Sequence, residues 1–137
     1  VRYDALPADA EFHRIDLDAG RVPLPDGWAD AVAGVETIEH LENPRAFARE
    51  LVRLCKPGGW VVVTTPNQLS LLSKLGLVLR NEFPHFRGLN YPAHLTALLE
   101  VDLRRIAAEC GLVDVAVRYS GRGRVPGTGR HFPGACG

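Results

Sequence analysis

The sequence is short of several features that mark common classes of protein. It has 137 residues, no methionine and only three cysteines, and its 16 basic residues balance 16 acidic ones. No two cysteines have the CxxC spacing of a zinc or redox site, so we expect no metal ligation, and the cytoplasm is the expected compartment. A net charge of zero indicates neither nucleic acid nor a membrane surface as a partner.

A hydrophobic run long enough to cross a bilayer is also missing. The longest largely apolar stretch, residues 69–79, contains Lys74 and two serines, and it is well short of the roughly 20 apolar residues that a span needs. The hydrophobic content of 46% is nevertheless enough for the core of one domain. Because position 1 is Val1 and no methionine follows, we expect an excised segment rather than a complete small protein.

Residues 31–64 carry the clearest structural pattern, a strand, a helix and a second strand. The short apolar run at 31–35 (AVAGV) is typical of a strand buried on both faces of a parallel sheet. Asn43 and Pro44 open a helix, because Asn caps free N–H groups and Pro fits the first helical position. The sequence PGG at 57–59 ends that helix and leads into a strand at 60–64 (WVVVT). The apolar stripe of the predicted helix consists of Phe47, Leu51, Leu54 and Cys55.

The other elements follow from weaker signals of the same kind. Alternating apolar residues predict strands at 12–17 and 112–119, the second near a sheet edge. Helical spacing predicts helices at 68–79 and 101–110, the second ended by Gly111 in a left-handed conformation. Residues 81–97 contain prolines and a glycine between aromatic residues, so we expect a long irregular segment there.

Four short motifs resemble those of the class I S-adenosylmethionine-dependent methyltransferases, especially the bacterial group with small-molecule acceptors. They are residues 24–30 (LPDGWAD), 36–41 (ETIEHL), 54–59 (LCKPGG) and 65–67 (TPN). No single motif is specific, but the four occur in the family's order and spacing. The resemblance implies an α/β fold, with a Rossmann-like sheet covered by helices on both faces. It also implies S-adenosyl-L-methionine as the cofactor and a small-molecule methyl acceptor as the partner.

The glycine-rich loop that holds the cofactor in this family is not found where it is required. Too few residues precede Asp16 to form a strand, the loop, a helix and another strand, and the glycines at 121–129 follow the last predicted strand and open no helix. We therefore expect residues 1–120 to be the central and C-terminal part of a methyltransferase domain whose first strands are missing. Residues 121–137 are expected to form a poorly ordered tail rich in Gly, Arg and Pro. Alone, this segment is expected to bind cofactor poorly or not at all and to be inactive.

The resemblance assigns cofactor-binding roles to acidic residues at strand ends. Asp16, with Leu17, ends the first predicted strand, where the family's acidic residue accepts a hydrogen bond from the adenine amino group. Asp18 is a competing candidate, and either residue is also explained as a solvated loop acid. Glu36 ends the next strand, beneath the methionine part of the cofactor. Its carboxylate can hold the ammonium group or a water, position the acceptor, or cap the following turn.

His40 is the best candidate for a general base, with Glu36 as a second catalytic candidate. Its imidazole is the only side chain near this sheet edge whose ordinary pKa is close to neutrality. The alternative is that His40 packs and hydrogen-bonds locally to fix its turn. Methyl transfer from a sulfonium needs mainly positioning and exclusion of water, so the reaction requires no metal.

Residues that bind the acceptor are expected after the third strand and in the irregular segment. Asn67 ends that strand and either contacts the acceptor or forms a turn with Pro66. His85, Tyr91 and His94 occupy the segment that in the family often covers the acceptor pocket, and nothing in its sequence identifies the acceptor.

Two other functions compete with a methyltransferase. A shortened, non-catalytic relative would act as a binding or interaction module without a functional cofactor site. A nicotinamide-dependent oxidoreductase is disfavoured because neither Tyr91 nor Tyr119 has a lysine four residues further along the chain.

Overall fold

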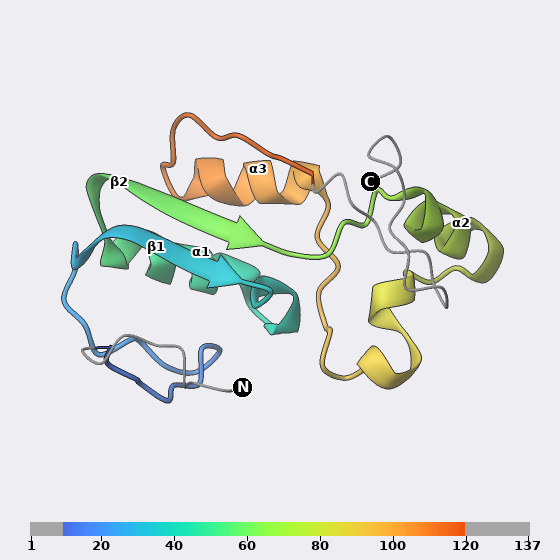
Figure 1. Cartoon of the computed structure of the whole chain (residues 1–137), viewed down its shortest axis with the longest axis horizontal. Coiled ribbons are helices and arrows are strands. Elements are labelled where there is room, and N and C mark those ends of the chain that lie inside the picture. The colour runs from blue at the N-terminus through green and yellow to red at the C-terminus, as the bar shows by residue number, and fades with distance from the viewer. Residues whose placement is uncertain (1–9, 120–137) are drawn as a thin grey trace.

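The computed structural model describes residues 10–119, and Figure 1 shows the arrangement of their helices and strands. In chain order the elements are β1 (Ala29–Val35), the 3-10 helix η1 (Ile38–His40), α1 (Pro44–Leu54), β2 (Cys55–Thr64), α2 (Leu71–Arg80), the 3-10 helices η2 (Pro84–Phe86) and η3 (Gly88–Asn90), and α3 (Glu100–Glu109). The predicted tail at 121–137 lies outside the described residues.

The predicted strand–helix–strand unit is confirmed. Strands β1 and β2 pair in parallel, with Val32 opposite Val61 and Gly34 opposite Val63. Helix α1 makes the connection between them and passes behind both strands in Figure 1. This is the crossover that two parallel strands require.

Local sequence signals explain where α1 begins and ends. The side chain of Asn43 accepts a hydrogen bond from the backbone N–H of Ala46 at 2.9 Å, and Pro44 occupies the first turn, as predicted. Phe47 and Leu51 are buried, and they belong to the predicted apolar stripe. The placement of Cys55 on that stripe was wrong, because the helix ends at Leu54 and Cys55 is already the first residue of β2.

The two glycines of the PGG motif lie within β2 instead of before it. Gly58 has a φ of +79°, which favours glycine. Gly59 runs so close to β1 that a Cβ atom on it would lie 2.6 Å from the carbonyl oxygen of Asp30. Pairing is irregular at this point, between Ala29 and Ala31. The motif thus shapes a bulge that carries the chain from α1 directly into the sheet.

The core lies on one face of the sheet. There, Val32, Val61 and Val63 pack against buried residues of η1, α1 and α3, among them Ile38, Phe47 and Ile106. On the opposite face of β2, Trp60 is 72% exposed, and Val62 and Val35 are exposed beside it. Helices of residues 10–119 therefore cover one face of the sheet, and the other presents apolar side chains to solvent.

Both strands predicted at the ends of this region were wrong. Residues 12–17 and 112–119 are irregular, and the sheet of residues 10–119 contains only β1 and β2. Val113 is 82% exposed, so the alternation at 112–119 does not reflect burial against a core. The left-handed conformation predicted for Gly111 is confirmed by its φ of +75°.

The region between β2 and α3 matches the prediction more closely. Helix α2 begins after Ser70, whose side chain accepts a hydrogen bond from the backbone N–H of Ser73 at 3.2 Å. Residues 81–97 are irregular apart from the short helices η2 and η3. Among residues 10–119, no helix combines the length and the hydrophobicity needed to cross a bilayer.

Candidate functional site

The candidate site lies at the carboxyl ends of β1 and β2, where open parallel sheets bind ligands. Glu36 follows β1 directly and has a φ of +46°, which is uncommon for a residue with a side chain. Its backbone N–H donates to the carbonyl oxygen of Thr64 at 3.1 Å and to the Thr64 hydroxyl at 3.0 Å. These bonds hold the exposed Glu36 at the edge, as predicted.

Helix η1 brings a buried carboxylate to this edge. The side chain of Glu39 is 0% exposed, and neither of its carboxylate oxygens has a hydrogen-bond partner. The imidazole of the neighbouring His40 lies beside it, with its Nε2 atom 3.9 Å from Oε1 of Glu39. An unpartnered carboxylate in the interior is costly, so this arrangement calls for an explanation.

Four hydrogen bonds hold residues 93–96 against η1. The backbone N–H groups of Leu95 and Thr96 donate to the carbonyl oxygen of Glu39 at 2.8 and 3.0 Å. The Thr96 hydroxyl donates to the carbonyl oxygen of Leu41 at 2.8 Å, and Nδ1 of His40 lies 2.6 Å from the carbonyl oxygen of Ala93. The irregular segment is therefore attached to the edge where the strands end, as Figure 1 also shows.

This attachment brings together two histidines that the sequence analysis treated separately. The rings of His40 and His94 meet edge to face, with their centroids 4.6 Å apart. Nδ1 of His94 lies 2.7 Å from the carbonyl oxygen of His85. Of the other residues predicted in this segment, His85 contributes its backbone while its side chain is exposed, and Tyr91 is also exposed.

The aspartates predicted to bind cofactor lie in a turn. Asp16 does not end a strand as predicted, and its side chain accepts a hydrogen bond from the backbone N–H of Asp18 at 3.0 Å. Asp18 accepts hydrogen bonds from the backbone N–H groups of Glu42 at 3.0 Å and Asn43 at 3.2 Å. Asp18 thus holds this turn beside the start of α1, while Leu17 packs against the core.

Asn67 takes part in a turn, which is the second of the two roles expected for it from the sequence. Its side-chain oxygen accepts a hydrogen bond from the backbone N–H of Leu69 at 2.8 Å, and its carbonyl oxygen accepts one from the Ser73 hydroxyl at 3.1 Å. These bonds organise the start of α2. Its predicted contact with an acceptor stays a prediction.

The comparisons with known proteins agree on one family. Residues 3–117 match the family described as Methyltransferase domain. The chain belongs to this methyltransferase family. A probable S-adenosylmethionine-dependent methyltransferase of Mycolicibacterium smegmatis is 35% identical over 121 residues, covering 82% of the chain and 46% of that protein. A 2-methyl-6-phytyl-1,4-hydroquinone methyltransferase of Synechocystis is 45% identical over 51 residues, covering 37% of the chain and 16% of that protein.

A solved structure supports the α/β methyltransferase fold. It is a SAM-dependent methyltransferase, possibly a histamine N-methyltransferase, from Thermotoga maritima, with a TM-score of 0.54 at 21% identity. The match covers 66% of the chain and 41% of that structure. The chain spans less than half the length of these curated relatives.

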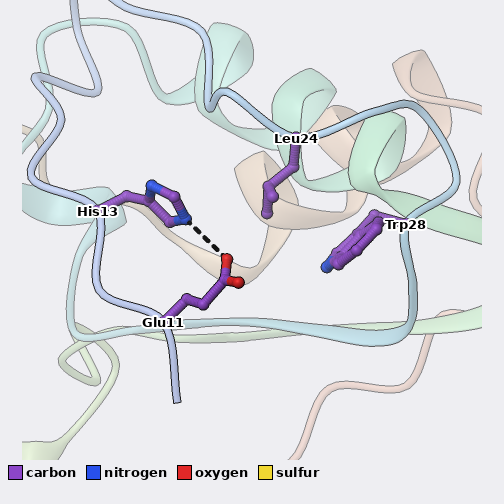
Figure 2. Close-up of a pocket in the computed structure, with 4 residues that line it drawn as sticks. All are labelled: Glu11, His13, Leu24 and Trp28. Atoms are coloured by element: carbon purple, nitrogen blue, oxygen red, sulfur yellow. Dashed lines mark ion pairs between the residues drawn. The ribbon is translucent and has the colours of Figure 1, made fainter. Parts of the chain in front are cut away.

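The hollow in Figure 2 lies away from the edge where this methyltransferase chain is expected to bind ligands. Its volume is about 350 Å³, and it is lined by Glu11, His13, Leu24 and Trp28. Trp28 directly precedes β1 and so marks the amino end of the strand. Its side chain is 57% exposed along this hollow.

Sequence reasoning on this methyltransferase chain missed Glu39 as a site residue. Its position beside His40 was visible, but a three-residue 3-10 helix has no periodicity that reveals which side chain is buried. Its proximity to His94 depends on the path of an irregular segment, which no spacing rule describes.

Proposed function

We propose that this protein transfers a methyl group from S-adenosyl-L-methionine to a small-molecule acceptor. The observation that carries the proposal is the gathering of polar side chains at the carboxyl edge of the sheet in a chain of the methyltransferase family. These are Glu36, Glu39, His40 and His94, with Asp16 and Asp18 in the turn beside the start of α1.

The chemistry of two exposed carboxylates suits the cofactor. Asp16 and Glu36 are both exposed, and carboxylates accept hydrogen bonds from hydroxyl and ammonium groups of the kind that S-adenosyl-L-methionine carries. Asp18 is a weaker candidate, because its Oδ1 atom is already shared between two backbone N–H groups. The cofactor supplies an activated methyl group, and the residues of the chain bind it, orient it and exclude water.

His40 is proposed as the base for an acceptor hydroxyl or amine. Since a carbonyl oxygen can only accept, Nδ1 of His40 carries the proton that it shares with Ala93. Nε2 therefore holds the lone pair of the neutral ring, and the side chain is 38% exposed, so a proton on an acceptor can reach it.

Residues 81–97 are proposed to contact the acceptor, with His85, Tyr91 and His94 as the side chains involved. The support for this proposal is the attachment of residues 93–96 to η1 at the ligand edge. The name of the Synechocystis relative indicates a hydroquinone acceptor for that protein, which is consistent with a small organic acceptor here. The free thiols of Cys55 and Cys110 suit a reducing compartment, and we propose the cytoplasm.

A non-catalytic binding module is the second candidate. The observation that favours it is the apolar face around Trp60, which is exposed in a sheet type that is ordinarily covered on both faces. A partner protein can cover such a face by packing against it, and so can further parts of a methyltransferase domain.

Calorimetric titration of S-adenosylhomocysteine separates the two candidates. The titration uses this chain and the whole protein encoded by its gene, each with the variants Asp16→Ala and Glu36→Ala and with Glu82→Ala as an exposed control. We expect micromolar binding to the whole protein, weakened at least tenfold by the first two variants and unchanged by the third. Absence of binding to the whole protein would overturn the enzyme proposal and favour the binding module.

A further inference from the structure

The carboxylate of Glu39 is the least explained group in residues 10–119. It is fully buried, and both of its oxygens are without a hydrogen-bond donor, while its own backbone carbonyl oxygen accepts two hydrogen bonds from residues 95 and 96. A buried carboxylate is ordinarily paired, hydrogen-bonded or bound to a cation. We therefore expect a positively charged partner to bind beside this side chain.

The imidazole rings of His40 and His94 lie beside this carboxylate, and their hydrogen bonds leave each ring in the form that binds metals. The Nδ1 atoms of His40 and His94 lie 2.6 and 2.7 Å from the carbonyl oxygens of Ala93 and His85. Each Nδ1 must therefore donate, which leaves Nε2 as an acceptor on each neutral ring. Metal-binding histidines are commonly oriented in this way, with the second ring nitrogen donating to a backbone carbonyl.

We propose that Glu39, His40 and His94 form a binding site for a divalent transition-metal cation, with Zn²⁺ as the best match. The candidate ligand atoms of the three side chains lie within 4.8 Å of one another. Two ligands of one zinc ion, each about 2.1 Å from it, lie closer together than this, so the rings close on the ion by about an ångström. His40 and His94 are only partly buried and can make this movement, while the fully buried Glu39 is the fixed ligand.

The set of ligands decides the class of metal. Two imidazole nitrogens and one carboxylate oxygen suit zinc and its neighbours, whereas Mg²⁺ and Ca²⁺ prefer oxygen ligands throughout. Three protein ligands leave at least one coordination position open for water or another small ligand, and both histidines are partly exposed to solvent.

The site is independent of the methyltransferase proposal, but it bears on one residue of it. A metal ion bound at Nε2 of His40 uses the same lone pair that would accept a proton from the acceptor. With the ion bound, His40 is a ligand and not a base.

The test is a zinc titration of the 137-residue chain after removal of metals with a chelator. A chromophoric zinc indicator serves as the competitor and reports affinity and stoichiometry. We expect one ion per chain, with affinity at least tenfold lower in His94→Ala and in Glu39→Gln. His13→Ala removes a histidine from the opposite end of β1 and is expected to bind as the unmodified chain does. Circular dichroism of each variant checks that it folds, and His94→Ala decides the matter if Glu39→Gln does not fold.

A second measurement uses the link between binding and stability. Zn²⁺ is expected to raise the Tm of the unmodified chain and of His13→Ala but not that of His94→Ala, because a ligand stabilises only the state that binds it. The Co²⁺ form is expected to show ligand-field bands without a thiolate charge-transfer band. Zinc binding of equal strength in all variants, a thiolate band, equally tight binding of Mg²⁺, or no binding at all would overturn the proposal.

Discussion

Arg53 holds Glu50 through two hydrogen bonds of 2.8 and 2.6 Å on the surface of α1. The same guanidinium donates to the carbonyl oxygens of Leu24 and Val22 and to the carboxylate of Asp26, and Glu50 accepts from the backbone N–H of Val22. The five hydrogen bonds that the Arg53 guanidinium donates are between 2.6 and 3.0 Å long. This pair therefore fixes the loop before β1 against the helix that follows it.

Replacing Arg53 by Ala is expected to destabilise the protein clearly. The change leaves two backbone carbonyl oxygens and the half-buried Glu50 without their shared donor, and lost donors to charged groups are costly. Arg53→Lys should recover only part of the loss, because a lysine cannot present the planar set of donors. Urea unfolding measures the effect, with Arg105→Ala, an exposed residue of α3, as the control. Equal stability of Arg53→Ala and Arg105→Ala would contradict this account.

The same contacts predict how stability depends on pH. The hydrogen bonds from Arg53 lower the pKa of Glu50 below its ordinary value of 4.5. A lowered pKa in the folded state means that the unfolded state binds the proton more tightly, so the stabilisation is complete above about pH 4.5 and is lost as the pH falls through the folded value. Arg53 also lowers the pKa of Asp26, which acts in the same direction.

Acid unfolding curves of the unmodified chain and of Glu50→Gln test this dependence. The variant is expected to be less stable at neutral pH. It is also expected to lose less stability between about pH 5 and pH 3, the range in which carboxyl groups ordinarily take up protons. Glu82→Gln, at an exposed position, should follow the unmodified chain. Parallel curves for Glu50→Gln and the unmodified chain would refute the prediction.

The two glycines of the PGG motif are expected to respond differently to alanine. At Gly58 a Cβ meets nothing within 4 Å, so Gly58→Ala should cost only the strain of a positive φ, about 1 kcal/mol. At Gly59 the Cβ would collide with the backbone of Asp30, which cannot move without disturbing β1, and we expect a loss of about 3 kcal/mol. Chemical denaturation of both variants measures the difference. A larger loss for Gly58→Ala would show that the close approach of the strands is unimportant.

The Thr96 hydroxyl is expected to hold the irregular segment at the site. Thr96→Val keeps the shape of the side chain but removes its hydrogen bond to the carbonyl oxygen of Leu41, at a cost of about 1 kcal/mol. The backbone amides of Leu95 and Thr96, which donate to Glu39, should then exchange with solvent faster. Hydrogen exchange measures this change, and Tyr91→Phe, which alters an exposed hydroxyl of the same segment, serves as the comparison. Unchanged exchange in Thr96→Val would show that the backbone contacts hold the segment without it.

The part of the fold that the sequence predicted well is the part whose signals are local. Asn43 and Pro44 mark the start of α1 within one residue, and the β-branched run after Trp60 identifies β2. The strands predicted at 12–17 and 112–119 failed because six to eight alternating residues do not determine a strand unless a neighbouring strand pairs with them.

The candidate site was predicted only in part, for a related reason. Glu36 and His40 could be placed from the order of the motifs, since both lie within a few residues of the end of β1. The meeting of His40 with His94 and the burial of Glu39 depend on how residues 81–97 fold back, and no local pattern encodes that path. Asp18 was proposed as a ligand contact, but its visible role is to join a turn to the start of α1.

The hydrogen bonds between η1 and residues 93–96 also impose an order on folding. His40 and Ala93 are 53 residues apart in the chain, and a contact of that separation forms slowly because a long loop must close first. The pairing of β1 with β2 joins residues that are closer in the chain, such as Val35 and Thr64, and this unit can form while the later residues are still being synthesised. The histidine pair is therefore the last part of this edge to assemble. It is also the first part to be lost when residues 93–96 detach from η1, before the content of helix and strand changes.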